Sequence, residues 1–238
     1  MKEYERLIDR DRVPRHVAIN MDGNGRWAQK RSLPRVEGHR RGAQVIESLM
    51  DAAIGLGIGV VSLFAFSTEN WSRPKDEIAG IWRLLEMFFE ANIEKIKKKG
   101  VRLRHSGSTL HLPASTRKII EDSVGQTRNN RVIILNFCLN YGGRQELLDA
   151  VNGWAASRKH GEKLSERALE RHLYTAGLPD VDLLIRTSGE HRISNFLLWQ
   201  LAYAEMIFTR VLWPDFKPRH LYRMIYEYQQ RDRRFGGL

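Results

Sequence analysis

The sequence predicts an α/β fold in which one domain holds a mostly parallel six-stranded sheet flanked by helices. The first observation is that short apolar runs alternate along the chain with longer segments of helical spacing, an order typical of a parallel sheet. The second is that the clearest runs, at 60–66, 132–137 and 181–185, lack alternation of polar and apolar residues. That pattern is typical of strands covered on both faces.

The first half of the chain is expected to contain strands, helices and one long polar loop. In chain order these are a strand over 16–21, a helix over 40–54, a strand over 60–66, a loop over 67–74, a helix over 75–98, a strand over 101–104 and a helix over 114–126. Gly55, Gly57 and Gly59 mark the end of the 40–54 helix, and Gly100 ends the 75–98 helix.

The second half continues the alternation of strand and helix. In chain order the expected elements are a strand over 132–137, a helix from Gly142 and Gly143 to Trp154, a helix capped by Ser165, strands over 181–185 and 206–208, and a helix over 218–231. No repeat, linker or change in composition divides residues 1–238. We therefore expect a single domain, with residues 1–14 as a mobile N-terminal arm.

Composition limits the class of protein. The 39 Lys and Arg residues exceed the 28 Asp and Glu residues, which gives a formal net charge of +11. Nucleic acid, an anionic membrane surface and phosphorylated small molecules all suit such a charge, and so does a protein that is merely basic. Cys138 is the single cysteine, which excludes a disulfide scaffold and a multi-cysteine zinc site. No apolar run reaches the ~20 residues of a membrane span, and a cytoplasmic location is expected.

Polar clusters follow three of the expected strands, where ligands bind in open α/β sheets. Residues 22–27, DGNGRW, combine two glycines with the start of a helix, which could approach an anion. A G-x-G-x-x-G fingerprint is absent, because its last position is Ala28. An Asx turn that caps the helix explains this segment equally well. Residues 67–74 are a weaker signal that an ordinary polar loop also explains.

The strongest cluster spans 186–195 and contains two arginines, two serines, a threonine and a histidine. This composition suits a diphosphate site, and the apolar residues on both sides make a solvated loop a poor alternative. Asp22 and Glu205 are the carboxylates that we expect to hold Mg²⁺ together with a diphosphate. His39 and His191 lack zinc-ligand spacing, so hydrogen bonds to phosphate are expected of them instead.

Taken together, the motifs make the chain resemble the cis-prenyltransferases, most closely those that make undecaprenyl diphosphate in bacteria. The matching segments are HVAINMDGNGRWA at 16–28, GHRRG at 38–42, FAFSTENW at 64–71, NYGGR at 140–144, DLLIRT at 182–187, EHRISNFLLWQ at 190–200 and WPDF at 213–216. Ser188 departs from the pattern, since glycine is frequent there. The D-D-x-x-D motif of trans-prenyltransferases is absent.

The resemblance implies an enzyme that condenses isopentenyl diphosphate onto an allylic diphosphate, usually farnesyl diphosphate, and makes each new double bond cis. The product would be a long-chain polyprenyl diphosphate, here undecaprenyl diphosphate, which carries sugars for cell-wall synthesis. It implies Mg²⁺ as cofactor, Asp22 as essential carboxylate and metal ligand, Asn70 as proton acceptor and Glu205 as second metal ligand. Residues implied for the allylic substrate are Gly23, Asn24, Gly25, Arg26, Trp27, Arg35, His39, Ser67, Thr68 and Glu69, with Trp71 and Arg73 beside Asn70.

For isopentenyl diphosphate the resemblance implies Arg186, His191, Arg192, Ile193 and Ser194. It also implies a homodimer in which Arg234 and Gly236 of the C-terminal tail reach the partner's site. A dry hydrophobic tunnel should hold the product, with Ala43, Ala65, Leu85 and Phe89 as candidate wall residues. The product would bring the enzyme into peripheral contact with the inner face of the membrane. A non-catalytic partner subunit is a second reading, which the presence of Asp22 and Asn70 disfavours. Nucleic-acid binding is a third reading, but the sequence has no stripe of interleaved basic and aromatic residues on one element. No nucleic-acid partner is therefore expected.

Overall fold

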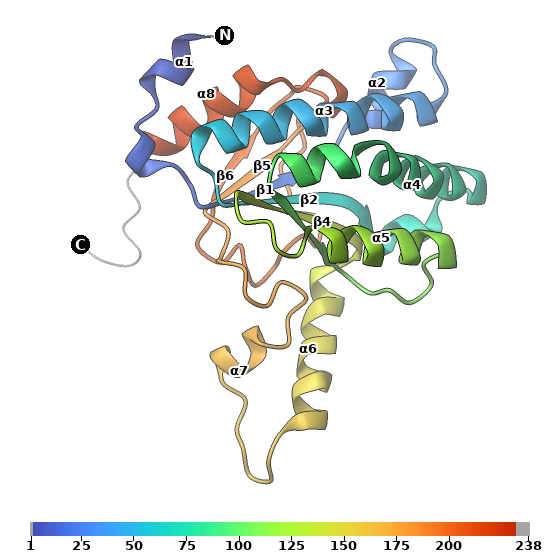
Figure 1. Ribbon diagram of the computed structural model, residues 1–238, viewed down its shortest axis with the longest axis vertical. Coiled ribbons are helices and arrows are strands. Elements are labelled where there is room, and N and C mark those ends of the chain that lie inside the picture. The colour runs from blue at the N-terminus through green and yellow to red at the C-terminus, as the bar shows by residue number, and fades with distance from the viewer. Residues whose placement is uncertain (1, 232–238) are drawn as a thin grey trace.

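The computed structural model describes residues 2–231 and contains one parallel sheet flanked by helices (Figure 1). The strands are β1 (His16–Asn20), β2 (Val60–Ser67), β3 (Val101–Ser106), β4 (Ile133–Tyr141), β5 (Leu183–Arg186) and β6 (Glu205–Phe208). The helices are α1 (Lys2–Leu7), α2 (Asn24–Gln29), α3 (Arg35–Leu56), α4 (Lys75–Lys98), α5 (Ala114–Thr127), α6 (Gly143–Ser157), α7 (Glu166–Glu170) and α8 (Pro218–Gln229). Short 3₁₀ turns are η1 (Arg10–Arg12), η2 (Thr68–Ser72) and η3 (Trp213–Asp215).

The six strands follow the order β3-β4-β2-β1-β5-β6, and every neighbouring pair is parallel. The predicted fold class is therefore confirmed, with an entirely parallel sheet where a mostly parallel one was expected. The order places β1 and β2 next to each other and β5 beside β1. Because all strands point the same way, the carboxyl ends of β1, β2 and β5 meet at one edge.

Helices α3, α4 and α8 cover one side of the sheet, whereas α6 and α7 extend away from the other side (Figure 1). The larger core lies under α3, α4 and α8, and its largest fully buried side chains include Trp213, Phe66 and Leu49. A smaller cluster on the opposite face contains Phe196 and Tyr141. None of the described helices combines the length and the apolar character needed to cross a bilayer.

Helix α3 begins at Arg35, five residues earlier than its apolar spacing predicted. Pro34 precedes it with φ of −57°, a suitable backbone for a helix start. Two glycines on its first turns allow close approach to the neighbouring loop. A Cβ on Gly38 would overlap the carbonyl oxygen of Asn24, and one on Gly42 would lie 2.5 Å from the Asn24 side-chain oxygen. The polar first turns of α3 are therefore helical because they pack against the start of α2 at Asn24. The spacing of apolar residues does not reveal this contact.

The N-terminal segment packs against the domain, and the expectation that residues 1–14 form a mobile arm stays a prediction. Helix α1 contacts α8, with the rings of Tyr4 and Tyr226 at a centroid distance of 5.7 Å. The Asp9 amide donates to Oε1 of Gln229 over 3.1 Å, and Nε2 of Gln229 donates to the Asp9 carbonyl over 2.7 Å. Ile8 is buried as well. These contacts place the segment against α8, which its charged composition did not reveal.

A buried chain of polar side chains crosses the sheet from β1 to β3. Nε2 of His16 lies 2.7 Å from Oγ of Ser62, which accepts from Nδ2 of Asn136 over 3.0 Å. Oγ of Ser106 donates to Oδ1 of Asn136 over 2.9 Å. Burial lowers the pKa of His16 to about 4, so its imidazole is neutral at pH 7. The chain satisfies polar groups inside the sheet and links four strands in register.

Candidate active site

A cavity of about 610 Å³ opens at the carboxyl ends of β1, β2 and β5. Most of its lining comes from the loops that follow these strands and from the first turns of α2 and α3. The lining residues are Asn20, Met21, Asp22, Gly23, Asn24, Gly25, Arg26, Arg35, His39, Phe64, Ala65, Phe66, Ser67, Glu69, Asn70, Arg73, Arg186, Ser194 and Asn195. The cavity thus has a polar part rich in arginine and an apolar part built by β2.

The loop after β1 holds Asp22 in place through its backbone. The Asp22 carbonyl accepts from Oγ1 of Thr187 over 2.6 Å and from the amide of Trp213 over 3.0 Å. Gly23 follows with φ of +109°, and a Cβ there would lie 2.9 Å from the Leu212 side chain. Glycine is required at that position for both reasons. Helix α2 begins directly afterwards, so its free N–H groups lie beside Asp22.

Two arginines surround the Asp22 carboxylate. Nη2 of Arg186 donates to Oδ2 over 3.0 Å, and Nη2 of Arg26 lies 3.4 Å from Oδ1. Arg186 is 4 % exposed, and its Nη1 donates to Oγ of Ser194 over 2.7 Å and to the carbonyl of Arg192. Its Nε has no partner among the described residues. A buried cation with donor capacity remaining at a cavity is suited to bind an anion.

A second group of basic side chains lies across the cavity around Glu77, two arginines and one histidine. Arg73 approaches this carboxylate at 3.2 Å, Arg35 at 3.6 Å and His39 at 3.8 Å. Burial, with the charges of Arg73 and Arg35, lowers the pKa of His39 to about 4. Its imidazole is therefore neutral at pH 7. Nε2 of His39 makes no hydrogen bond among the described residues, so this buried nitrogen can contact a ligand.

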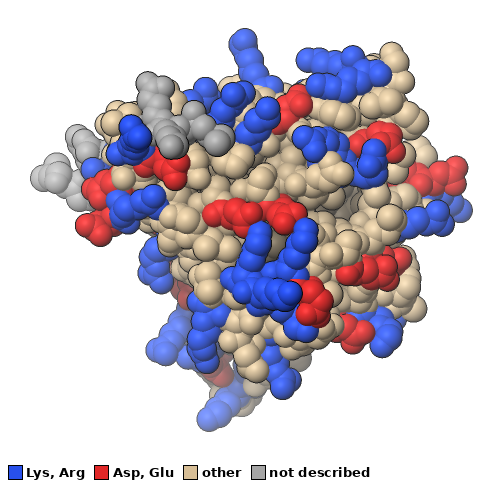
Figure 2. Space-filling model, turned by 45° about the horizontal axis from the view of Figure 1, so that its top comes forward, with Lys and Arg blue, Asp and Glu red and all other residues tan. Residues whose placement is uncertain are grey.

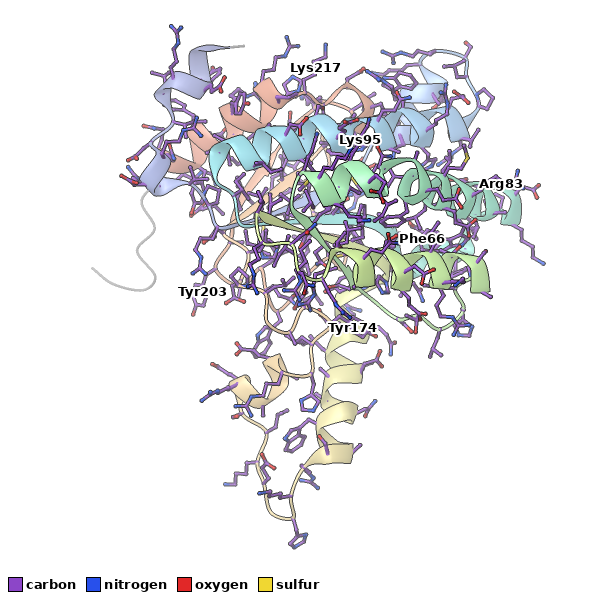
Figure 3. The ribbon with its side chains drawn as sticks, viewed as in Figure 1. Phe66, Arg83, Lys95, Tyr174, Tyr203 and Lys217 are labelled. Atoms are coloured by element: carbon purple, nitrogen blue, oxygen red, sulfur yellow. The ribbon has the colours of Figure 1, made fainter. Side chains whose placement is uncertain are left out.

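The turn after β2 carries Asn70. Oδ1 of Asn70 accepts from the Ser67 amide over 3.2 Å, which closes a capping box at the start of η2. Behind this turn, Trp71 donates from Nε1 to Oδ1 of Asn140 over 2.7 Å and packs edge-on against Phe66. Phe66, labelled in Figure 3, lies beneath α4 and is 1 % exposed. Trp71 therefore supports the turn from the core side.

Most of the residues that the sequence nominated meet at this cavity. Those that line it are Asp22, Gly23, Asn24, Gly25, Arg26, Arg35, His39, Ser67, Glu69, Asn70, Arg73, Arg186 and Ser194. Thr68, Trp71, His191, Arg192 and Ile193 stand close to it in the chain but outside its lining. Arg234 and Gly236 lie outside the described residues, so the expectation placed on them stays a prediction.

Trp27 lies outside the lining of the cavity, so its expected contact with substrate stays a prediction. Its Nε1 donates to Oδ1 of Asp215 over 2.8 Å, and the guanidinium of Arg31 stacks on its ring at 4.2 Å. The α2 turn directs Arg26 and Trp27 to different sides, which spacing in a loop does not reveal.

The three residues between Glu190 and Ser194 also face elsewhere. His191 stacks on Phe208 at a centroid distance of 5.0 Å, exposed Arg192 pairs with Glu190, and Ile193 packs in the smaller core cluster. From residues 190–194, the carbonyl of Arg192 and the hydroxyl of Ser194 accept hydrogen bonds from Arg186.

Glu205 lies apart from Asp22 within one chain, and the expectation that both hold one metal ion stays a prediction. Glu205 pairs in register with Leu183 at the start of β5, whereas Asn20, just before the Asp22 loop, is level with Arg186 at its end. Three residues of strand separate the two levels by about 10 Å. Oε2 of Glu205 instead accepts from Nη1 of Arg231 over 2.7 Å. The register of a short strand such as β6 is set by the fold and is not readable from its sequence.

The donors that are present fit a metal shared with substrate. Among the described residues, no three His, Cys, Asp or Glu side chains form a group that could hold a metal. Mg²⁺ needs only one or two carboxylates when substrate phosphates and water complete its shell. Asp22 lines the cavity with its side chain 29 % exposed, so it can provide one carboxylate.

Sequence reasoning missed several lining residues. Asn20, Met21, Phe64 and Phe66 belong to the ends of β1 and β2 and were assigned to strands alone. Asn195 was included in the 186–195 cluster but given no role. The sequence could have indicated a role for Asn195, because it lies between Ser194 and the apolar residues 196–199, where the chain must turn from the loop into the core.

The sequence is similar to those of known proteins over almost the whole chain. Residues 20–236 match the family model described as "Putative undecaprenyl diphosphate synthase". The isoprenyl transferase of Leptospira interrogans is 50 % identical over 231 residues, which cover 95 % of this chain and 96 % of that protein. The isoprenyl transferase of Bacillus subtilis is 48 % identical over 230 residues, covering 95 % and 88 %.

Two solved structures share the fold. Lavandulyl diphosphate synthase from Lavandula x intermedia, in complex with dimethylallyl diphosphate, has a TM-score of 0.91 and 32 % identity, covering 95 % of this chain and 99 % of that one. A structure described as a probable undecaprenyl diphosphate synthase from Campylobacter jejuni has a TM-score of 0.80 and 36 % identity, covering 94 % and 98 %. Together with the cavity at the carboxyl ends of the strands, these matches show that the chain belongs to the undecaprenyl diphosphate synthase family of prenyltransferases.

Proposed function

We propose that this chain elongates an allylic diphosphate, with farnesyl diphosphate as the starter, by adding isopentenyl diphosphate units with cis double bonds. The product is a long-chain polyprenyl diphosphate, undecaprenyl diphosphate, for the lipid carrier of cell-wall synthesis. The observation that carries the proposal is the single cavity in which Asp22 and Arg186 face an apolar wall formed by Phe64 and Ala65. A substrate with a charged diphosphate and an apolar tail needs both parts side by side.

The allylic diphosphate is assigned to the α2 side of the cavity. Gly23, Asn24 and Gly25 begin this helix, where free N–H groups favour an anion. Arg26 and Arg35 add positive charge on either side. Neutral His39 can donate one hydrogen bond from Nε2, since its other nitrogen lies 3.4 Å from Nδ2 of Asn24. These groups stabilise the negative charge that develops as the diphosphate leaves.

Isopentenyl diphosphate is assigned to the opposite side, beside Arg186 and Ser194. The planar guanidinium of Arg186 can present two donors to one diphosphate, which a lysine cannot. Between the two sides, Nη2 of Arg26 lies 3.0 Å from Oε1 of Glu190, so this arginine is near both proposed diphosphates. The cations thus counter the mutual repulsion of two diphosphates in one cavity.

In each condensation, a carbon–carbon bond forms between C4 of isopentenyl diphosphate and C1 of the allylic substrate. The C1–O bond breaks, the diphosphate leaves with the electron pair, and a proton departs from C2 of the isopentenyl unit. Asp22, together with the diphosphate, would hold Mg²⁺, which would stabilise the leaving group as a Lewis acid. Asn70 lines the cavity at the turn after β2 and is the assigned proton acceptor. The apolar wall excludes water from the allylic carbon.

The growing chain is proposed to extend beneath α4, away from the charged groups. Ala65 lines the cavity, and Leu85 and Phe89 of α4 belong to the core against which β2 packs. A small apolar cleft of about 30 Å³ lies farther along, between Ile46 and Met50 of α3 and Phe88 of α4. If α3 and α4 moved apart, the small cleft would join the main cavity and form the tunnel that a long product needs.

The remaining parts of the proposal concern assembly and location. We infer a homodimer, in which Leu148 and Val151 on the exposed side of α6 are available for contact at 59 % and 39 % exposure. We place the enzyme in the cytoplasm, with its apolar product bringing it to the inner face of the membrane. On the face in Figure 2, Lys and Arg are interspersed with Asp and Glu, which supports diphosphate binding over a continuous nucleic-acid surface.

The test is a turnover assay with labelled isopentenyl diphosphate, farnesyl diphosphate and Mg²⁺, followed by chromatography of the dephosphorylated products. Incorporation of label into a long-chain polyprenol, and loss of incorporation with EDTA, are expected. A purified, folded chain that incorporates no label with any allylic starter would overturn the enzymatic proposal. Products that stop after one or two condensations would overturn the long-chain part alone.

A further inference from the structure

Asn195 connects three segments that meet at the cavity. Its Oδ1 accepts from the amide of Arg144 over 2.9 Å, at the first turn of α6. Its Nδ2 donates to Oε1 of Glu69 over 2.8 Å, on the turn after β2. Its backbone carbonyl accepts from the amide of Gly143 over 2.7 Å. Both ends of one amide are therefore used, and each holds a different element.

The backbone at Asn195 is unusual in a way that supports a dedicated role. Ser194 has φ of +53°, Asn195 of +61° and Leu197 of +45°. Left-handed backbone is costly for residues other than glycine, with asparagine among the more tolerant. Such strain persists where the surroundings hold it and gathers at functional sites. Here it turns the chain sharply between Ser194, the partner of Arg186, and buried Phe196.

The neighbouring glycines show how closely these segments approach. A Cβ on Gly142 would lie 2.5 Å from Oγ1 of Thr68 and 2.9 Å from Nδ2 of Asn195. A Cβ on Gly143 would lie 2.7 Å from the side chain of Leu198. Glycine at both positions lets the start of α6 come within hydrogen-bond distance of Asn195. The three-way contact is thus built into the sequence at 142–143 as well as at 195.

Glu69 is the charged partner in this contact. Partial burial acts to raise the pKa of its carboxyl group, but the hydrogen bond from Asn195 and those within its own turn outweigh burial and lower that pKa. Glu69 is therefore ionised at pH 7 and needs a donor at position 195. A carboxylate at 195 would leave two negative charges facing each other.

We propose that Asn195 is a positioning residue for the prenyl transfer. It fixes the position of the loop that carries Ser194, the partner of Arg186, relative to the turn that carries Asn70. The inference rests on the proposed function, in which these two segments serve the two substrates. A shift of about 1 Å between reacting groups can cost about a hundredfold in rate. Asn195 acts on the reaction through Glu69 and Ser194 and does not itself need to touch either substrate.

A purely structural reading is that Asn195 only caps α6. In that case the bond to Arg144 matters and the bond to Glu69 does not. Asn195→Asp separates the two readings, because one carboxylate oxygen can still accept from the Arg144 amide while the other oxygen faces Glu69. Adding Glu69→Gln then restores a donor. The side-chain amide introduced at position 69 can donate to the carboxylate introduced at position 195, which reverses the direction of the original hydrogen bond.

The experiment measures kcat and both KM values for the wild type, N195D, E69Q and the double variant. Asn195→Asp is expected to lower kcat about tenfold in the wild type and at most about twofold in the E69Q background. KM values should change less than kcat, since the substrates keep their own contacts. Ser165→Ala, which removes the cap of α7 outside the cavity, is the matched control and should keep wild-type kcat.

Equal losses in the two backgrounds would overturn the positioning role. An inactive wild type would instead overturn the proposed function, so the two failures are distinguishable. Thermal melting checks that each variant is folded. If N195D melts early, Asn195→Gly tests the same point, because glycine keeps the positive φ and removes only the side chain. Its kcat should also fall about tenfold, and wild-type kcat in that variant would contradict the inference.

Discussion

Nη2 of Arg186 donates a hydrogen bond of 3.0 Å to Oδ2 of Asp22, although 164 residues separate the two in the chain. The pairing follows from the sheet, because Asn20 of β1 and Arg186 of β5 are level in register. Arg186 is almost fully buried, and an unpaired charge there would be costly. Asp22 therefore balances this charge before substrate binds. In the proposed function, a diphosphate with its metal ion would take the place of this ion pair.

The first prediction concerns the guanidinium group of Arg186, which makes several hydrogen bonds at once. Arg186→Lys keeps the charge but loses the simultaneous bonds to Asp22, Ser194 and the Arg192 carbonyl. The KM for isopentenyl diphosphate should rise about tenfold or more, and that for the allylic substrate should change less. Arg128→Lys, at an exposed position outside the cavity lining, is the control and should leave both KM values unchanged. Steady-state kinetics with each substrate varied checks this, and equal rises in both KM values would mean that the two diphosphate sites are assigned wrongly.

Product length should respond to Ala65, whose side chain lines the apolar part of the cavity. In Ala65→Leu, the larger side chain reduces the space for the growing chain, because packed walls adjust poorly to added volume. The variant should form shorter polyprenols while the first condensations continue. Ala202→Leu, an exposed position outside the cavity lining, is the control. Chromatography of the products tests this, and an unchanged length distribution in a folded Ala65→Leu variant would remove Ala65 from the tunnel wall.

The buried histidines predict how stability depends on pH. His16 and His39 have pKa values lowered to about 4 from a usual 6.5, mainly by burial. Above pH 6.5 both are neutral in the folded and unfolded chain. Between pH 6.5 and 4 the unfolded chain binds protons that the fold does not, so stability falls as pH falls. Each histidine should contribute up to roughly 1.4 kcal/mol per pH unit in this window.

Urea unfolding at pH 7.5 and at pH 5 measures that slope. His16→Gln should be less stable than the wild type at pH 7.5 but lose less further stability at pH 5. His160→Gln, at an exposed position, should keep the wild-type slope. A His16→Gln slope equal to that of the wild type would show that His16 does not titrate as a buried group.

The tail prediction concerns residues 234–238, which lie outside the described residues. Their deletion is expected to leave a folded dimer that uses isopentenyl diphosphate poorly, since Arg234 and Gly236 are assigned to the partner's site. Mixed with Asp22→Ala chains, the truncated chain should regain part of the activity, because one hybrid site then has both an intact Asp22 and an intact tail. Activity no greater than that of the two parents, with heterodimers shown by native mass spectrometry, would contradict a shared site.

The sequence predicted most of the sheet because its strands are buried on both faces, as at Val17 and Leu184. It also brought Asp22, Arg186 and Asn70 to one edge, since parallel strands share their carboxyl ends. It did not predict that Trp27 faces Asp215, because the direction of a side chain at a helix start depends on the loop packed behind it.

Glu205 and Asn195 show two further limits. Glu205 was grouped with Asp22 because of its place near a sheet edge beside arginines and because of the resemblance, whereas the register of β6 places it level with Leu183, at the start of β5. Asn195 was one polar residue in a polar loop, and its role became visible only when Glu69 and Arg144 were seen on either side of it. Both depend on contacts between distant segments, which local pattern and composition do not encode.

The central claim, that the cavity holding Asp22 is where prenyl transfer occurs, is tested most directly by comparing wild type and Asp22→Asn for turnover of labelled isopentenyl diphosphate. The asparagine keeps the size of the side chain and the backbone bonds to Thr187 and Trp213 but removes the negative charge. Turnover should fall by about 10²–10³ or more. The variant should remain folded, with a melting temperature lowered by the loss of the counter-charge of buried Arg186. A folded variant that keeps a tenth or more of wild-type turnover with Mg²⁺ present would contradict the account.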